Sequence, residues 1–248
     1  MKVKSILVSQ PEPQTAKSPY FELAEKNGLK IDFRPFIQVE GVPAKEFRQT
    51  RIQILEHSAV IFTSRTAIDH YFRIAQELRL TIPDTMKYFC ISEATAFYLQ
   101  KYIVYRKRKI FYADGKFSDL TNLMKKHSGE KFLVPLSDIH KQEIPQLLDQ
   151  GGYKYTKAIL YRTVSADLSD LADIKYDILV FFSPSGIKSL FQNFPEFVQD
   201  STRIACFGPS TAKAVRDAGL RLDIEAPTAQ APSMTMALEQ YIKKVNKN

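Results

Sequence analysis

The chain contains an internal duplication, and this feature limits its possible folds more than any other. Residues 61–68, Ile-Phe-Thr-Ser-Arg-Thr-Ala-Ile, align with residues 180–187, Val-Phe-Phe-Ser-Pro-Ser-Gly-Ile. Further alignments pair 90–96 with 206–212, 6–9 with 132–135, and the stretch ending at Gly28 with the stretch ending at Gly152. All of these pairs keep nearly the same offset, which chance rarely produces. Because the period is too long for a solenoid, we expect a doubled domain.

Both halves predict the same order of elements. A short apolar strand, at 4–8 and again at 131–135, leads into a helix that stops at Gly28 or Gly152. A second strand follows in each half, and then an apolar strand ending in Ser or Thr, a helix, a short strand and a further helix. Strands that alternate with helices predict parallel sheets covered on both faces, so the expected fold class is α/β.

Composition and charge narrow the possible functions. Hydrophobic residues make up 44% and charged residues 25% of the 248 residues, as in ordinary globular proteins. The apolar run at the N-terminus is too short for a signal-peptide core, and the longest one, near 178–182, is far below the roughly 20 residues of a membrane span. With only Cys90 and Cys206, a reducing cytoplasm is the expected compartment. The net charge of +8 favours acidic partners, whether nucleic acid, membrane or small molecule.

Polar residues occur where the predicted strands end and the following helices begin. Open parallel sheets bind ligands at this carboxyl-terminal edge. The segments 63–64, 183–186 and 208–211 each resemble a helix start, with Ser or Thr available as a cap and, in the latter two, Pro near the first turn. Any one of them alone is more often a plain cap. Their recurrence in matching places of the two halves favours a shared anion-binding site.

Other chemistries have little support. The four histidines show no metal-ligand spacing, and the two cysteines hold equivalent strand ends, where packing residues are expected. The sequence has neither a Gly-x-Gly-x-x-Gly nor a Walker motif. The basic, aromatic stretch 101–112 is compatible with nucleic-acid binding. The favoured interpretation is an apolar strand whose Lys/Arg cluster forms a solvated turn or guards a sheet edge.

Several motifs together resemble the uroporphyrinogen-III synthase (HemD-like) family, in the right order and spacing from Lys2 to about Ile242. They are Ile61-Phe62-Thr63-Ser64, Ala158-Ile159-Leu160-Tyr161-Arg162-Thr163-Val164, Phe181-Phe182-Ser183-Pro184-Ser185-Gly186, Phe207-Gly208-Pro209-Ser210-Thr211-Ala212 and Ala226-Pro227-Thr228. The resemblance implies two flavodoxin-like parallel-sheet domains joined by a two-stranded β-ladder. It assigns residues 1–35 plus 165–248 to a discontinuous α/β domain, 39–156 to a second one, and about 31–38 and 157–164 to the linker strands.

Members of this family convert linear hydroxymethylbilane to uroporphyrinogen III, with loss of water and inversion of ring D, and they need no metal or organic cofactor. The resemblance makes Tyr161 the proton donor to the leaving hydroxyl, with a packing role as the equal alternative. The resemblance implies that the chain binds this small poly-carboxylate substrate. The sequence itself favours a cytoplasmic protein with no membrane partner, disfavours nucleic acid as a partner, and, because it has no coiled-coil pattern, favours a monomer. The residues implied to line a cleft between the domains are Thr63, Ser64, Arg65, Thr95, Ser183, Ser185, Gly186, Gly208, Ser210, Thr211 and Thr228.

The sequence departs from the family pattern in two places. Ser92 stands where Gly is usual, and the carboxylate of Glu93, which follows it, would repel an acidic substrate. The run 136–143 lacks the Gly and Arg that many members carry, and Lys141 or Arg65 is the candidate replacement for the missing positive charge. The alternative is therefore a catalytically inactive HemD-like protein that binds an anionic ligand between its domains.

Overall fold

The computed structural model describes residues 2–172 and 174–246. It confirms the α/β class with parallel sheets. The chain divides into two compact units, unit 1 with Met1–Gln38 and Val164–Asn248, and unit 2 with Val39–Thr163. Among the described residues, no helix has the length and apolar character needed to cross a bilayer.

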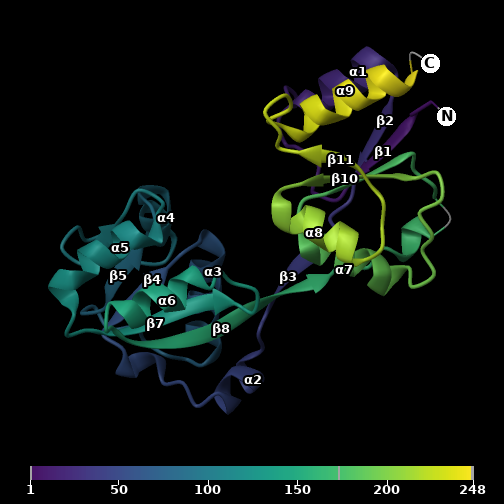
Figure 1. Cartoon of the computed structure of the whole chain (residues 1–248). Helices are drawn as coiled ribbons and strands as arrows, with labels where there is room; N and C mark the ends of the chain where they lie inside the picture. The colour runs from purple at the N-terminus through teal and green to yellow at the C-terminus, as the bar shows by residue number, and fades with distance from the viewer. Residues whose placement is uncertain (1, 173, 247–248) are drawn as a thin grey trace. The chain divides into compact units, whose positions relative to one another are not determined.

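Unit 1 is a parallel sheet with helices on both faces (Figure 1). Its strands lie in the order β11-β10-β9-β1-β2. Side chains alternate along each strand, so Ile6 and Val8 pack with α1 and α9 while Leu7 packs with α7 and α8. The elements are β1 (Ser5–Val8), α1 (Pro19–Asn27), β2 (Lys30–Phe33), the 3-10 helix η4 (Ser169–Leu171), β9 (Ile178–Phe181), α7 (Pro184–Asn193), β10 (Arg203–Phe207), α8 (Pro209–Asp217), β11 (Leu222–Ala226) and α9 (Met234–Asn246).

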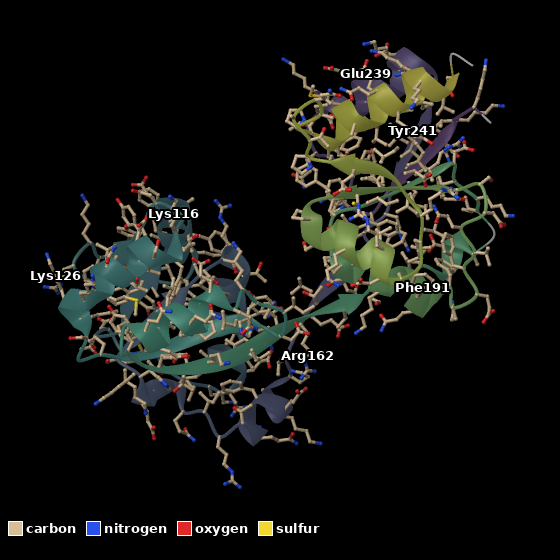
Figure 2. All side chains as sticks on the ribbon, in the orientation of Figure 1. Lys116, Lys126, Arg162, Phe191, Glu239 and Tyr241 are labelled. Atoms are coloured by element: carbon tan, nitrogen blue, oxygen red, sulfur yellow. The ribbon has the colours of Figure 1, made fainter. Side chains whose placement is uncertain are left out.

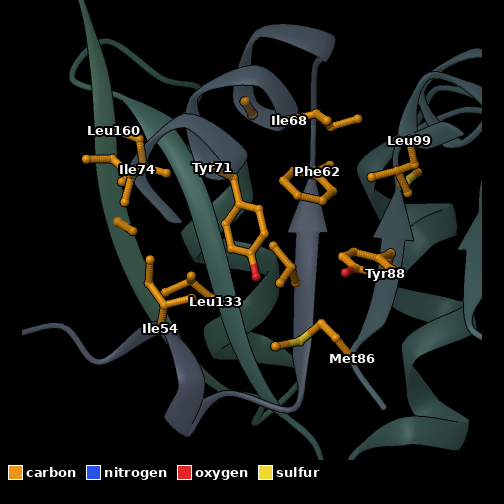
Figure 3. Packing of buried hydrophobic residues seen from close by; sticks show 14 of the residues in the cluster. Ile54, Phe62, Ile68, Tyr71, Ile74, Met86, Tyr88, Leu99, Leu133 and Leu160 are labelled. Atoms are coloured by element: carbon orange, nitrogen blue, oxygen red, sulfur yellow. The ribbon is translucent and has the colours of Figure 1, made fainter. Parts of the chain in front are cut away.

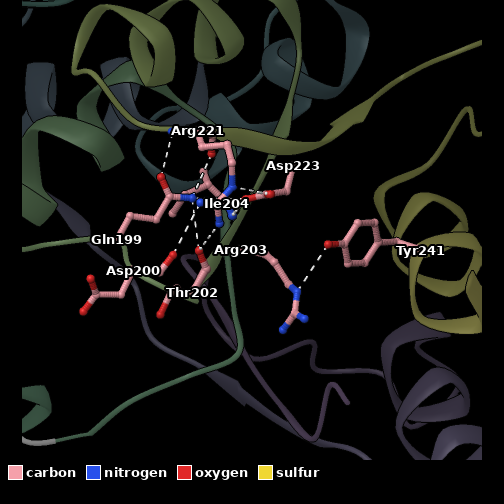
Figure 4. A network of polar contacts seen from close by, with 8 residues as sticks. All are labelled: Gln199, Asp200, Thr202, Arg203, Ile204, Arg221, Asp223 and Tyr241. Carbon is pink, nitrogen blue, oxygen red and sulfur yellow. Dashed lines mark hydrogen bonds and ion pairs between the residues drawn. The ribbon is translucent and has the colours of Figure 1, made fainter. Parts of the chain in front are cut away.

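One carboxylate accepts hydrogen bonds at a β-bulge between β10 and β11 (Figure 4). Ile204 lies opposite Leu222 and Ala205 opposite Ile224, so Asp223 is the extra residue. The Asp223 carboxylate accepts hydrogen bonds from Ile204 N at 2.9 Å and from Arg221 Nε at 2.7 Å. The backbone N–H that the irregular ladder leaves without a strand partner is therefore satisfied by a side chain.

Unit 2 has the strand order β3-β8-β7-β4-β5-β6, in which β4 to β8 are parallel. Along β3 and β8, Ala166 N donates to Phe36 O and Val42 N to Leu160 O, so this pair runs antiparallel. The elements are β3 (Ile37–Gly41), α2 (Ala44–Gln49), η1 (Ile54–Glu56), β4 (Ala59–Phe62), α3 (Arg65–Glu77), β5 (Lys87–Cys90), α4 (Glu93–Tyr98), η2 (Leu99–Lys101), β6 (Ile110–Tyr112), α5 (Phe117–Met124), η3 (Lys125–His127), β7 (Lys131–Ser137), α6 (Glu143–Gln150) and β8 (Lys154–Ser165).

One cluster of buried residues in the core of unit 2 includes the inner face of α3 (Figure 3). This helix buries Ile68, Tyr71 and Ile74 at a spacing of three and four residues, the signature of one apolar helix face. The Tyr71 ring meets that of Phe62 edge-to-face at 5.4 Å. Because α3 is packed so tightly against the sheet, the polar side chains on its flanks are held at fixed positions.

The topology explains the sequence duplication. The sheet orders β2-β1-β9-β10-β11 and β8-β7-β4-β5-β6 are equivalent, and the aligned repeats occupy equivalent strands in them, β4 with β9, β5 with β10 and β1 with β7. Each sheet combines strands from both repeats, because β1 and β2 pair with β9 to β11 and not with β4 to β6. Unit 1 has the flavodoxin-like order, and unit 2 has the same spatial arrangement with its strands permuted along the chain. The chain order reverses between β1 and β9 in unit 1 and between β4 and β7 in unit 2.

One local prediction differs from the structure, and another is confirmed over a shorter strand than expected. The predicted strand 31–38 is two strands, because the chain leaves the β1–β2 pair after Phe33 and begins β3 at Ile37. In the basic stretch only Ile110–Tyr112 forms a strand, which lies at the edge of the sheet, while Lys107 and Arg108 are exposed in a turn. The structure thus supports the interpretation of a solvated turn beside an edge strand.

Candidate functional site

The carboxyl ends of the parallel strands in unit 2 surround a cavity of about 410 Å³. It lies beside β7 and β4, where the chain order of the sheet reverses, the position at which such sheets bind ligands. Its lining includes hydroxyl groups, two lysines and one phenol: Thr63, Ser64, Lys116, Ser137, Lys141 and Tyr161.

Tyr161 presents its phenol to this cavity from β8. The side chain is 9% exposed, and its hydroxyl lies 3.4 Å from Ser64 Oγ, a long contact for two hydroxyl groups. Burial raises the pKa of Tyr161, and the contact with Ser64 acts in the opposite direction without cancelling it. The phenol is therefore protonated near pH 7. Because its contact with Ser64 is long, the hydroxyl can also form a hydrogen bond with a ligand.

Ser64 links the phenol to the start of α3. Its backbone is extended, and its Oγ accepts a hydrogen bond from Ala67 N at 3.0 Å, so it is the N-cap that the sequence predicts. The remaining N–H groups of the first turn favour an anion at this end of the helix. Arg65 follows, exposed, with its guanidinium 5.5 Å from the centre of the Tyr98 ring.

The charges at the cavity are mixed, with an excess of positive ones. Lys116, which precedes α5 (Figure 2), and Lys141 line it together with the carboxylate of Glu143. Glu93, the predicted source of repulsion, instead accepts a hydrogen bond from Tyr112 Oη at 3.0 Å. Of the two candidate sources of positive charge, Lys141 lines this cavity, whereas Arg65 is not among its lining residues.

Ser92 has a structural role that a glycine would not provide. Its Oγ accepts a hydrogen bond from Thr95 N at 3.3 Å and lies 3.0 Å from Thr95 Oγ1, capping the short helix α4. The Thr95 side chain is 6% exposed and engaged by this contact. Ser92 is thus the N-cap of α4, and its side-chain oxygen makes the capping hydrogen bond.

The loop after β7 is fixed by hydrogen bonds to a carboxylate. Asp138 accepts from Ile139 N at 2.9 Å and from Thr163 N at 3.0 Å. Burial acts to raise the pKa of Asp138, but these hydrogen bonds outweigh it and hold the pKa below its ordinary value. His140 Nδ1 donates to Ser137 O at 2.9 Å, and its Nε2 is buried with no hydrogen-bond partner among the residues that the structure describes. Sequence analysis did not identify His140 or Ser137 as part of the site.

Unit 1 carries equivalent helix starts at the carboxyl ends of β9 and β10. Ser183 Oγ accepts from Gly186 N at 3.2 Å and caps α7. Gly208, at the N-cap of α8, has φ of +90°, a conformation that only glycine adopts without strain. No Ser or Thr side chain caps α8, unlike the sequence prediction, because Gly208 occupies the cap itself.

The other predicted residues of unit 1 lie at the same edge with different accessibility. Ser185 and Ser210 are in the first turns of α7 and α8, and Ser210 is exposed. Thr211 is 1% exposed, so it offers solvent little of its side chain. The exposed Thr228 accepts a hydrogen bond from Ala231 N at 3.0 Å and shapes the loop after β11.

The structure therefore brings Thr63, Ser64 and Tyr161 together in one cavity and places the unit 1 residues at the matching edge of their own sheet. Within residues 2–172 and 174–246, no group of three or more His, Cys, Asp or Glu side chains is arranged to hold a metal ion.

Known proteins show the same fold and sequence pattern. The chain is similar to the uroporphyrinogen-III synthase of Chlorobaculum parvum, with 25% identity over 97% of this chain and all of that protein. It is also similar to the enzyme of Saccharomyces cerevisiae, with 27% identity over 52% of each chain. Among solved structures, the uroporphyrinogen-III synthetase of Helicobacter pylori matches with a TM-score of 0.59 at 18% identity, over 97% of this chain and 99% of that one.

The family model described as uroporphyrinogen-III synthase HemD matches residues 18–236, a range that includes most of both units. This match covers the cavity around Tyr161, the helix starts of unit 1 and the aligned segments of the duplication other than residues 6–9. The chain belongs to the uroporphyrinogen-III synthase family.

Proposed function

We propose that this chain is an active uroporphyrinogen-III synthase, which closes hydroxymethylbilane to uroporphyrinogen III with loss of water and inversion of ring D. The observation that carries the proposal is the Tyr161 phenol, held beside a capped helix start in a cavity that contains two lysines. This combination supplies a proton donor and an anion-binding surface within one site.

Tyr161 is the proposed general acid. Its proton passes to the hydroxyl of the hydroxymethyl group, the carbon–oxygen bond breaks, and water leaves. The substrate becomes a cation-like azafulvene, and the resulting phenolate regains a proton when the product pyrrole loses one. Because burial raises the pKa of Tyr161, the phenol holds its proton at neutral pH until the leaving oxygen accepts it.

Helix starts and lysines are the proposed carboxylate-binding groups. Each helix N-terminus contributes roughly 0.3–1 kcal/mol toward an anion, and hydrogen bonds to charged groups add roughly 1.5–3 kcal/mol each. In unit 2 these groups are the first turn of α3 with Lys116 and Lys141, and in unit 1 the first turns of α7 and α8. Several such contacts on one flexible, multiply acidic substrate are enough to select one conformation.

Selecting that conformation determines the product. Without guidance the azafulvene is attacked by the free end of ring D, and the type I isomer forms. Formation of type III requires attack from the substituted carbon of ring D through a spiro intermediate. Holding the acidic side chains so that this carbon faces the reactive centre is catalysis by orientation, which contributes a large share of many rate accelerations.

The decisive experiment incubates the purified protein with hydroxymethylbilane and separates the uroporphyrinogen isomers after oxidation to the porphyrins. We expect type III to dominate, with the type I isomer at the level left by spontaneous closure. A product that is type I alone, at the rate of a protein-free control, would refute the proposal and support the inactive, anion-binding alternative.

A further inference from the structure

The Tyr161 ring is held from two sides by α3. Its hydroxyl meets Ser64 at the start of the helix, at 3.4 Å. Its ring stacks on the imidazole of His70, with the ring centres 5.0 Å apart and the planes inclined by 16°. Because the hydroxyl contact is long, the stacked ring is the stronger constraint on the direction in which the phenol points.

His70 is held in turn by Arg73. Arg73 Nε donates to His70 Nδ1 at 3.1 Å. A guanidinium cannot accept a hydrogen bond, so Nδ1 carries the lone pair and the proton of the neutral ring lies on Nε2. Burial lowers the pKa of His70, and the charge of Arg73 adds to this, while Asp69 and Glu77 act in the opposite direction. The ring that stacks on Tyr161 is therefore neutral near pH 7.

Arg73 also holds the backbone that leads into Tyr161. Its Nη2 donates to Leu160 O at 3.2 Å, one residue before Tyr161 on β8, and to Val42 O at 2.8 Å. A Cβ atom at Gly41 would lie 2.7 Å from the Arg73 guanidinium carbon. Glycine at position 41 thus leaves the space that the guanidinium occupies, and one side chain fixes both the ring partner and the main chain of the proposed acid.

We propose that Arg73 and His70 are positioning residues that direct the Tyr161 phenol at the leaving hydroxyl of the substrate. This inference rests on the proposed function of Tyr161. Proton transfer needs heavy atoms within about 3 Å of one another, and misplacement by about 1 Å can cost roughly a hundredfold in rate. Loss of either residue therefore lowers the rate of water loss and leaves binding of the acidic side chains in place.

The test is a double-mutant cycle with Tyr161→Phe. We expect His70→Ala and Arg73→Met each to lower kcat by about ten- to a hundredfold with little change in KM, and to raise the type I share of the product. In the Tyr161→Phe background neither change should lower kcat further, because the group that they position is already gone. Gly41→Ala, which displaces the guanidinium, should reproduce the effect of Arg73→Met.

A matched control is His127→Ala. His127 also packs on an aromatic ring of unit 2, 4.5 Å from Phe111, and it lies outside the cavity lining. We expect its kcat and isomer ratio to equal those of the wild type. If the control lowers kcat as much as His70→Ala does, the effect is one of general stability and the inference is wrong.

The outcomes separate this inference from the proposed function. If the wild type forms no type III isomer, the proposed function fails. If the wild type does form the type III isomer, two results would still refute the positioning role alone. One is that His70→Ala lowers kcat equally with and without the Tyr161 hydroxyl, and the other is that His70→Ala changes only KM. Should His70→Ala not fold, Gly41→Ala decides the question, because it displaces the Arg73 guanidinium and leaves the His70 side chain in place. A Gly41→Ala protein with the kcat of the wild type would then overturn the inference.

Discussion

Replacing Tyr161 with Phe should separate catalysis from stability. The phenolic hydroxyl has one long contact, 3.4 Å to Ser64 Oγ, and Ser64 Oγ retains its hydrogen bond from Ala67 N at 3.0 Å when the phenol is gone. No buried donor or acceptor loses its last partner, so the free energy of unfolding should change by about 0.5 kcal/mol or less. A lost general acid, in contrast, lowers the rate by about 10²–10⁴-fold, or roughly 3–5 kcal/mol of activation free energy.

The assay measures kcat for type III formation alongside urea unfolding of the same preparations. Tyr155→Phe is the matched control, because Tyr155 lies on the same strand and its hydroxyl donates to the Asp149 carboxylate at 2.9 Å on the surface. We expect the control to retain full activity. A Tyr161→Phe protein with unchanged kcat, or one whose activity falls only in step with its stability, would show that the residue serves packing.

The remaining predictions concern stability. Gly208→Ala should cost about 1–3 kcal/mol in chemical unfolding, because φ is +90°, whereas Gly129→Ala, with open space and ordinary φ, should be near neutral. The pKa of Asp177 is lowered because, although burial alone would raise it, hydrogen bonds from Lys4 N and Ser5 N prevail. Its stabilisation is present above its unfolded pKa and lost as pH falls through the folded value, so Asp177→Asn should weaken the acid-induced loss of stability below about pH 4. Burial lowers the pKa of His57, so stability should fall as pH drops below about 6.5, and this fall should be smaller in His57→Gln when Tm is measured at pH 5 and pH 7.

Much of the fold can be predicted from the sequence because its signals are local. Apolar runs followed by Ser or Thr marked β4 and β9, and the caps at Ser64 and Ser183 lie where they were expected. The aligned repeats predicted equivalent strands, which the two sheets contain. The division of the strand at 31–38 was missed, because pairing with β1 or with β8 is a long-range choice that leaves no local pattern.

The site was only partly predictable for a related reason. A strand tyrosine and helix caps are visible as motifs, whereas the stacking of His70 on Tyr161 joins residues far apart in the chain. The spacing of the histidines in the sequence does not fit a metal site and indicates no other role for them. The helical spacing of His70, Arg73 and Glu77 after the Ser64 cap is the signal that could have indicated a polar face beside the site. The role of Asp138, in contrast, is visible only in the structure, where its carboxylate accepts a hydrogen bond from Thr163 N.

The central proposal is that the carboxyl-terminal edge of each sheet binds carboxylate groups of the tetrapyrrole. Titration of the ¹⁵N-labelled protein with uroporphyrinogen III under reducing conditions, followed by amide chemical shifts, tests it most directly. We predict the largest shifts at the first turns of α3 and α7, for example at Ala67 and Gly186. Shifts confined to the basic segment 106–109, with both helix starts unperturbed, would contradict the account.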